Sequence, residues 1–355
     1  MKKIVAMLLV GIMTVGLTAC GSKSEPSVAE NSTTDQSATE EGKNSEQEPE
    51  KKELTVAGIV FQDDQFMNML TQGYVAAAEE YGVKILTDNT NNDSAKEVEL
   101  INTYMTQNVD GLVIAPLNAD ASVAALRQAD ENGMKVALTN IDLTDAEFIV
   151  AGYTSNDYNN CYLAGQEAAE IMKEKSQDGP LKIATLQFAS QLPDISKNRI
   201  DGYLKALDDA GVNYEVVANQ DAWLQDTALE AASSIITANS DLDVIIAVND
   251  GGTIGAVMAV QNAGLSDKIM VFGHDGSDQI SSMILDDTAP LQSVVAQDPY
   301  GMGYQAMSAL IRALQGEDYS STQGKCEYMD GIVLSVRNKD SVNSWRVDNG
   351  YEAIE

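Results

Sequence analysis

The feature that most constrains the fold is a regular alternation, from Leu54 onward, of short apolar runs and longer segments with helical spacing. Most runs are continuously apolar, which is typical of parallel strands that helices cover on both faces. Strands that alternate with helices along a chain predict an α/β fold with doubly wound, Rossmann-like sheets. The strands that we expect are Leu54–Val60, Val83–Thr87, Gly111–Ala115, Lys135–Leu138, Lys182–Leu186, Tyr214–Val217, Val244–Val248, Ile269–Phe272 and Leu291–Val295.

The segments between the runs carry the signals of amphipathic helices. From Phe66 to Tyr81, apolar side chains recur every three or four positions and therefore share one face. Gly82 follows this segment, where a left-handed residue commonly ends a helix. The alternation breaks near Ser155 and then restarts, and 355 residues suit two domains better than one large sheet.

The first twenty residues have the pattern of a targeting segment. Lys2 and Lys3 precede an apolar stretch that ends in the sequence L-T-A-C-G around Cys20. This ending resembles a bacterial lipobox, which implies cleavage before Cys20 and lipidation of that residue. A plain signal peptide with a chance cysteine is the alternative. Residues 21–52 contain almost no large apolar side chain, and we expect them to form a disordered acidic tether.

The charge balance argues against one class of partner. The chain has 54 Asp and Glu residues against 22 Lys and Arg residues, a formal net charge of -32. Nucleic-acid binding needs a basic surface, and none is visible, so we expect no nucleic-acid partner.

Scarce histidine and cysteine exclude most metal and cofactor chemistry. His274 is the single histidine, so a histidine-based metal site has no support. The cysteines are Cys20, Cys161 and Cys326, without a C-x-x-C pair, so we expect no metal and no cofactor. Cys161 and Cys326 are expected to be separate thiols, with a disulfide as the alternative.

Polar and aromatic residues gather where the expected strands end. In open α/β sheets, ligands bind beyond the carboxyl ends of the strands. Asp64 and Phe66 follow the first strand, and the later strands are followed by Asn140, Asp194, Arg199, Trp223, Asn249, Asp250, His274, Asp275 and Gln297. Carboxylates, amides and one guanidinium suit a neutral ligand with many hydroxyls, and aromatic faces suit a sugar ring. No glycine-rich phosphate loop follows the first strand.

Between about Leu54 and about Val336 the chain resembles periplasmic sugar-binding proteins of the ribose/galactose-binding family, the type I receptors of ABC importers. The sequence D-D-Q-F-M at Asp63–Met67 is similar to the D-D-N-F-M of the galactose-binding members. The resemblance implies that Asp64 accepts a sugar hydroxyl and that Phe66 stacks on the ring. It assigns further ligand contacts to Asn140, Asp194, Arg199, Trp223, Asn249, Asp275 and Gln297.

Departures from the family pattern indicate the kind of sugar. Asp194 lies five residues before Arg199 rather than four, which weakens its assignment. The ribose-binding members have Asn and Arg where this chain has Ala115 and Ile141. These differences favour a hexose-like pyranose, with glucose or galactose first. Ribose, xylose, inositol and the furanosyl signal autoinducer-2 stay open, as do contacts from Met67 and Asp142.

The resemblance also implies a domain assignment and a mechanism. One domain comprises 53–155 plus 298–330, the other comprises 156–297 plus 331–340 with a last strand, and 341–355 is a tail. Three crossings, near Ser155, Gln297 and Asp330, form a hinge that closes on the ligand. The closed form, a monomer lipid-anchored outside the cell membrane, delivers a neutral monosaccharide to a membrane permease.

Structural explanations stay open for most of the candidates. Asp64 can cap a helix, with Asp63 as a further candidate, and Phe66 and Met67 can belong to the core. Arg199 can be a surface residue paired with Asp201. Trp223 can be core, and Asn249 and Asp275 can be cap or turn residues.

Two other functions are weighed against import. A glycosidase using Asp64 and Asp275 is the enzyme alternative, but no other catalytic group accompanies them, so we expect no enzyme. A receptor that presents its ligand to a sensor or chemotaxis system has the same sequence features as an import protein. A repressor of this fold needs an amino-terminal DNA-binding motif, whose place the leader and tether occupy.

Overall fold

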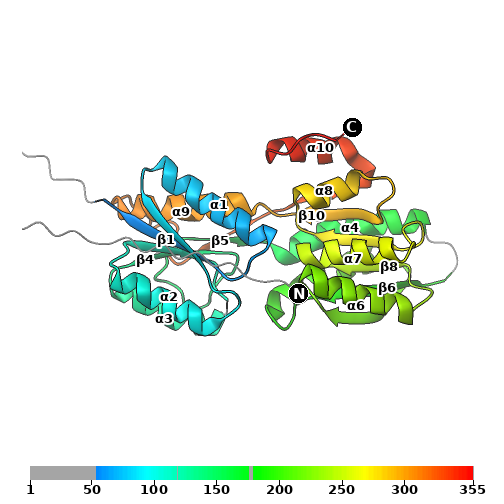
Figure 1. Ribbon diagram of the computed structural model, residues 1–355, viewed down its shortest axis with the longest axis horizontal. Helices are drawn as coiled ribbons and strands as arrows, with labels where there is room; N and C mark the ends of the chain where they lie inside the picture. The colour runs from blue at the N-terminus through cyan, green and yellow to red at the C-terminus, as the bar shows by residue number, and fades with distance from the viewer. Residues whose placement is uncertain (1–52, 118, 176–178, 355) are drawn as a thin grey trace, which may run out of the picture. The chain divides into compact units, whose positions relative to one another are not determined.

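A computed structural model describes residues 53–117, 119–175 and 179–354, which contain two six-stranded sheets (Figure 1). The first sheet has the order β11-β5-β4-β3-β1-β2, with every pairing parallel. Its strands are β1 (Thr55–Val60), β2 (Lys84–Asn89), β3 (Gly111–Ile114), β4 (Lys135–Thr139), β5 (Gly152–Ser155) and β11 (Cys326–Met329).

The second sheet has the order β12-β10-β9-β8-β6-β7 and is parallel except for the antiparallel pairing of β10 with β12. Its strands are β6 (Leu181–Gln187), β7 (Tyr214–Asp221), β8 (Val244–Ala247), β9 (Met270–His274), β10 (Leu291–Ala296) and β12 (Ile332–Ser335). The central strands β3 and β8 are buried along their whole length, whereas the edge strands β2 and β7 contain exposed residues.

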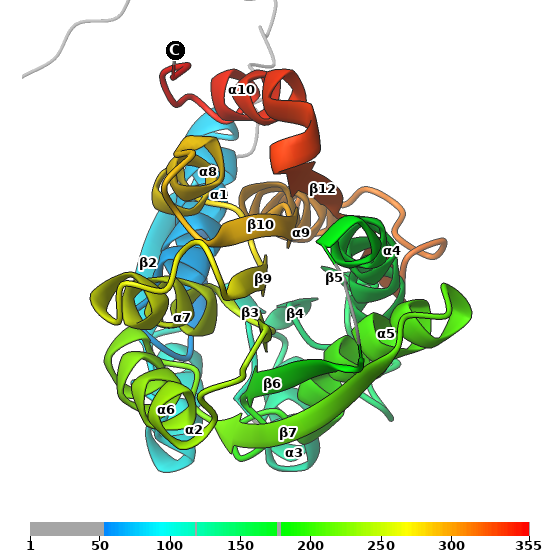
Figure 2. The same cartoon turned by 90° about the vertical axis from the view of Figure 1, so that its right-hand side faces the viewer.

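Helices cover both faces of each sheet, which confirms the doubly wound α/β prediction. On the first sheet, α1 (Gln65–Glu80) and α9 (Pro299–Leu314) cover one face, and α2 (Ser94–Thr106) and α3 (Ala119–Glu131) the other. On the second, α4 (Asp157–Lys175) and α5 (Pro193–Asp209) lie opposite α6 (Gln225–Ala238) and α7 (Asp250–Asn262) (Figure 2).

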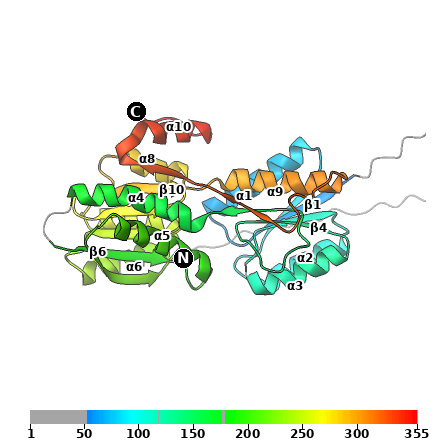
Figure 3. The ribbon, with the colours of Figure 1, turned by 180° about the vertical axis from the view of Figure 1, so that it is seen from behind.

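The chain passes between the sheets at three links. They fall after β5 ends at Ser155, after β10 ends at Ala296, and between the end of β11 at Met329 and the start of β12 at Ile332. Figure 3 shows β10 and α9 from behind, on either side of the second link. We refer to these as the first, second and third links.

The carboxyl-terminal segment is more ordered than we expected. Residues 341–355, for which we expected a tail, contain most of α10 (Lys339–Asp348), which follows the 3-10 turn Val336–Asn338. Helix α10 packs on α8 (Asp278–Leu285) and buries Val342 and Trp345, so this segment belongs to the second sheet.

The predicted leader, Cys20 and the tether lie outside the described residues. Within the described ranges, no helix is both long and apolar enough to cross a bilayer.

Candidate binding site

A cavity of about 40 Å³, here called the inner cavity, lies where strands of both sheets end. Seven of the nine predicted binding residues line it: Asp64, Phe66, Asn140, Arg199, Asn249, Asp275 and Gln297. The other lining residues are Phe61, Gln62, Met67, Phe188, Gln191, Leu192, Ile195 and Asp250. The topology therefore brings together residues that are far apart in the sequence.

Asp64 combines a structural role with a place in the cavity. It is the N-cap of α1, and its Oδ1 accepts a hydrogen bond of 2.8 Å from the Met67 backbone N–H. The Gln62 carboxamide donates to the other carboxylate oxygen. Burial raises the pKa of Asp64 despite these two hydrogen bonds, which lower it. The capping explanation is therefore correct for Asp64; Asp63 instead accepts from the Asn68 side chain.

Phe66 and Met67 belong to the hydrophobic core and also line the inner cavity. Their exposed fractions are 9% and 2%, and both pack in the core between α1 and the first sheet. Both also line the inner cavity. The inner cavity therefore has apolar side chains beside the Asp64 carboxylate.

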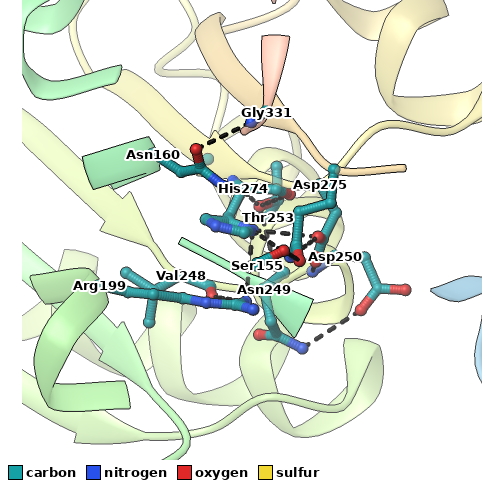
Figure 4. Close-up of polar contacts among 12 residues, drawn as sticks. Ser155, Asn160, Arg199, Val248, Asn249, Asp250, Thr253, His274, Asp275 and Gly331 are labelled. Atoms are coloured by element: carbon teal, nitrogen blue, oxygen red, sulfur yellow. Dashed lines mark hydrogen bonds and ion pairs between the residues drawn. The ribbon is translucent and has the colours of Figure 1, made fainter. Parts of the chain in front are cut away.

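Arg199 is buried at the floor of the cavity rather than on the surface. Its Nε donates to Asp157 Oδ1 at 2.7 Å, and its Nη1 donates to the Val248 carbonyl at 2.8 Å (Figure 4). The guanidinium also lies 5.3 Å from the centre of the Phe188 ring. The surface alternative is wrong, because Asp201 pairs with Lys197 instead.

Asp275 is the most heavily hydrogen-bonded carboxylate of the cavity. Gln297 Nε2 donates to its Oδ1 at 2.7 Å, His274 Nδ1 lies 3.0 Å from the same oxygen, and the Asp250 backbone N–H donates to Oδ2. Burial raises its pKa, but His274, Arg199 and the Gln297 hydrogen bond outweigh burial and leave the pKa below its ordinary value. Asp275 has a φ of 72°, the left-handed conformation of a turn residue.

His274 itself is fully buried. Burial, followed by the charge of Arg199, lowers its pKa. The ring is therefore neutral at pH 7, and within the described chain its Nε2 has no hydrogen-bond partner.

Asn249 holds the start of α7. Its Oδ1 accepts from the Gly252 backbone N–H, and its Nδ2 donates to the Trp223 carbonyl at 2.9 Å. The cap explanation is therefore correct for Asn249, which also lines the cavity.

Asp250 is a cavity residue that we placed at a strand end but did not assign to the site. The signal was its position directly after Asn249. Burial and the nearby carboxylates of Asp64 and Asp275 hold its pKa well above its ordinary value.

Two predicted residues do not reach the inner cavity. Trp223 is half-buried between β7 and α6 and packs against the core of the second sheet, and its carbonyl accepts a hydrogen bond from the Asn249 side chain. Asp194 lies on another side of α5, because Leu192, Ile195 and Arg199 follow the spacing of one helical face. The separation of five residues between Asp194 and Arg199, instead of the four in the family pattern, indicates in the sequence that the two side chains do not share a face.

A second cavity of about 370 Å³, here called the outer cavity, adjoins the first. Four residues line both: Asn140, Gln191, Leu192 and Ile195. Asp194 and Asp142, whose roles the sequence left uncertain, line the outer cavity.

Hydrogen bonds join the first link to Gln297, which lines the inner cavity, and the third link to helix α4. Ser155 in the first link donates to the Gln297 carboxamide oxygen in the second. The Gly331 backbone N–H in the third link donates to Asn160 Oδ1 at 2.8 Å (Figure 4).

No group of acidic, histidine or cysteine side chains in the described ranges has the arrangement of a metal site. Cys161 and Cys326 are free thiols, which confirms the expectation of two separate cysteines.

Comparisons with known proteins identify relatives of one kind. Residues 57–318 match the protein family described as the periplasmic binding protein domain. The ABC transporter periplasmic-binding protein YphF of Escherichia coli K12 is 26% identical over 269 residues, covering 74% of this chain and 81% of that protein. The D-apiose import binding protein of Actinobacillus succinogenes is 27% identical, covering 80% of this chain and 88% of that protein.

Solved structures share the fold. A galactofuranose binding protein superposes with a TM-score of 0.74 at 20% identity, covering 84% of this chain and 100% of that chain. A solute binding protein from Bacillus halodurans with bound myo-inositol gives 0.73 at 17% identity, covering 82% and 98%.

Proposed function

The chain belongs to the periplasmic binding protein domain family, and from this premise we propose that it captures a neutral monosaccharide for an ABC-type importer. The family consists of extracytoplasmic substrate-binding proteins and not of enzymes. The observation that carries the proposal is the inner cavity, in which polar groups from both sheets converge on one small space. Relatives that include a D-apiose import binding protein and a ribose import binding protein support a carbohydrate ligand.

The lining chemistry suits a sugar. Asp64 and Asp275 offer acceptors to hydroxyl groups, Asn140 and Asn249 offer both donors and acceptors, and Arg199 offers donors. Phe66 offers an apolar face for the C–H side of a ring. A hexose such as glucose or galactose is the first candidate, with ribose, xylose, inositol and autoinducer-2 as alternatives.

Ligand capture operates by closure of two domains about the three links. The first domain comprises 53–155 plus 298–330, and the second comprises 156–297 plus 331–340, extended by α10. A ligand that contacts Asp64 from one sheet and Arg199 from the other favours the closed state, because only that state makes every contact. The closed form docks on the permease as a monomer, anchored by lipid at Cys20.

A ligand screen tests the proposal. Glucose, galactose, ribose, xylose and inositol are added to the folded protein, and the unfolding temperature is followed. A ligand present at about 100 times its dissociation constant stabilises a protein by about 2.7 kcal/mol. We expect at least one carbohydrate to raise the unfolding temperature and to reduce the radius of gyration in X-ray scattering. The absence of any stabilising carbohydrate overturns the proposal.

A further inference from the structure

The outer cavity is large enough for a ligand group of its own. Its volume of about 370 Å³ lies within the range of roughly 300–1,000 Å³ that small-molecule pockets occupy. The inner cavity, at about 40 Å³, has room for only a few water molecules. A ligand that touches the inner residues therefore has most of its available space in the outer cavity.

The outer cavity has the lining of a carbohydrate subsite. Asp142, Asp194 and Asn198 supply polar groups, while Leu117 and Pro193 supply apolar surface. This mixture of hydrogen-bonding side chains and apolar patches matches the alternating O–H and C–H surface of a sugar ring.

Tyr328 adds an aromatic face to the same space. It lies on the edge strand β11, its side chain is 55% exposed, and its hydroxyl donates to Asp142 Oδ2 at 2.6 Å. This hydrogen bond fixes the ring while leaving much of its surface uncovered. An anchored and exposed tyrosine is suited to stacking against a sugar.

Asn140 joins the two cavities and has an unused side chain. It lines both cavities and is 8% exposed, and its backbone is fixed by hydrogen bonds to Tyr153 and Thr154. Among the described residues, its carboxamide has no hydrogen-bond partner. Its carboxamide therefore keeps access to the cavities, where a ligand that spans both can form hydrogen bonds with it.

Gln191 and Leu192, which directly precede α5, are two of the four residues that line both cavities. Gln191 donates from Nε2 to Gln62 at 2.9 Å and to Asn92 at 2.6 Å, and Leu192 lies next to it. Gln191 and Leu192 are both half-buried and line both cavities.

We propose that the outer cavity is a second carbohydrate subsite, so that the protein also binds a glycoside or disaccharide of its monosaccharide, and binds it more tightly than the monosaccharide alone. One ring contacts the inner residues through Asn140, and the second ring or aglycone lies against Tyr328 and Asp142. This inference rests on the proposed carbohydrate function and specifies its substrate class.

Calorimetric titration tests the inference with a defined panel of D-glucose, D-galactose, maltose, lactose and the methyl glucosides. We expect a disaccharide or glycoside to bind at least tenfold more tightly than its parent monosaccharide. Tyr328→Ala should weaken the extended ligand about tenfold and change the monosaccharide less than twofold. Tyr328→Phe, which keeps the ring, should retain most of the affinity.

Two controls separate the possible failures. Tyr300→Ala removes another exposed tyrosine, which lies on α9 and lines neither cavity, and should change no affinity. Asp64→Ser removes an inner carboxylate while keeping a residue that caps helices, and should weaken every carbohydrate. Equal binding of parent and extended ligands, or a Tyr328→Ala protein with unchanged affinities, overturns the subsite and leaves the proposed function standing. If none of these carbohydrates binds but a sugar of the thermal screen does, the subsite is overturned and the proposed function stands; if no carbohydrate of either set binds, both are overturned.

Discussion

The Ser155 hydroxyl donates a hydrogen bond to the Gln297 carboxamide, although 142 positions separate the two residues in the chain. Ser155 ends β5 at the first link, and Gln297 follows β10 at the second. The Gln297 amide nitrogen in turn donates to Asp275 in the inner cavity. A single side chain therefore connects two interdomain links with the candidate site.

Removing this connection should weaken ligand binding as well as the fold. Ser155→Ala leaves the buried Gln297 oxygen without its donor, at a cost of about 1–3 kcal/mol. We expect affinity for the carbohydrate to fall and X-ray scattering to record a smaller compaction at saturation. Ser293→Ala is the matched control, because the buried Ser293 hydroxyl has no partner in the described chain. Equal affinities in wild type and Ser155→Ala contradict the connection.

Helix α10 supports the loop that carries Asp275. A side chain added at Gly276 meets the Trp345 ring and the Ala296 side chain at less than the contact distance of real Cβ atoms. Gly276→Ala should displace the loop and weaken ligand binding at least tenfold in calorimetry. Gly82→Ala is the control for strain away from the site: with φ of 64° it should lower stability, but a Cβ there meets no atom within 4 Å and ligand affinity should not change. Similar affinities for the two variants argue against this support.

The buried ion pair of Arg199 and Asp157 should make the single substitution costly. Arg199→Met leaves Asp157 buried without its partner, which destabilises a protein by about 3–5 kcal/mol. Urea unfolding should record this loss, and the double variant Arg199→Met with Asp157→Leu should recover part of it. The exposed pair of Lys197 and Asp201 provides the comparison, and Lys197→Ala should cost about 0.5 kcal/mol or less. If Arg199→Met is as stable as Lys197→Ala, loss of Arg199 from the buried ion pair does not destabilise the fold as predicted.

The carboxylates of the inner cavity predict a specific dependence of stability on pH. The pKa of Asp250 in the folded protein lies above its ordinary value of 3.8, so between these two values the folded state holds a proton that the unfolded state has lost. The stability of wild type relative to Asp250→Asn should therefore fall as pH rises through this window. Urea unfolding at several pH values measures the difference. A difference that stays constant with pH, or rises with it, contradicts the assignment.

Asp275 should behave in the opposite way. Its pKa lies below the ordinary value of 3.8 in the folded protein, so its contribution is present above that value and is lost as the pH falls through the folded pKa. The stability of wild type relative to Asp275→Asn should therefore decrease in acid. The stability difference between wild type and variant should therefore change with pH in opposite directions for Asp250→Asn and Asp275→Asn. General acid unfolding would change both differences in the same direction.

The sequence predicts the fold well where burial determines it. The nine expected strands are present because central parallel strands need continuous apolar runs, as in β3 and β8. Strands β5 and β11 escaped prediction because G-Y-T-S and C-E-Y-M contain no such run. Helix α10 escaped because the burial of Trp345 depends on contacts with distant residues.

The candidate site follows the same division. Residues directly after a strand, such as Asp64 and Asp275, could be placed because parallel topology fixes the carboxyl edge of a sheet. Trp223 and Asp194 could not, because the path of a loop and the rotation of α5 depend on tertiary packing. Asn249 and Asp64 are also helix N-caps. At these two positions the same polar side chain serves both the local structure and the candidate site.

The most direct test of the central claim is calorimetric titration of wild type and Asp64→Ser with the carbohydrate that gives the largest thermal stabilisation. Serine keeps the cap of α1 but removes the carboxylate that faces the inner cavity. We predict that wild type binds one carbohydrate per chain and that Asp64→Ser loses at least tenfold in affinity while remaining folded. An Asp64→Ser protein that binds as tightly as wild type contradicts the account.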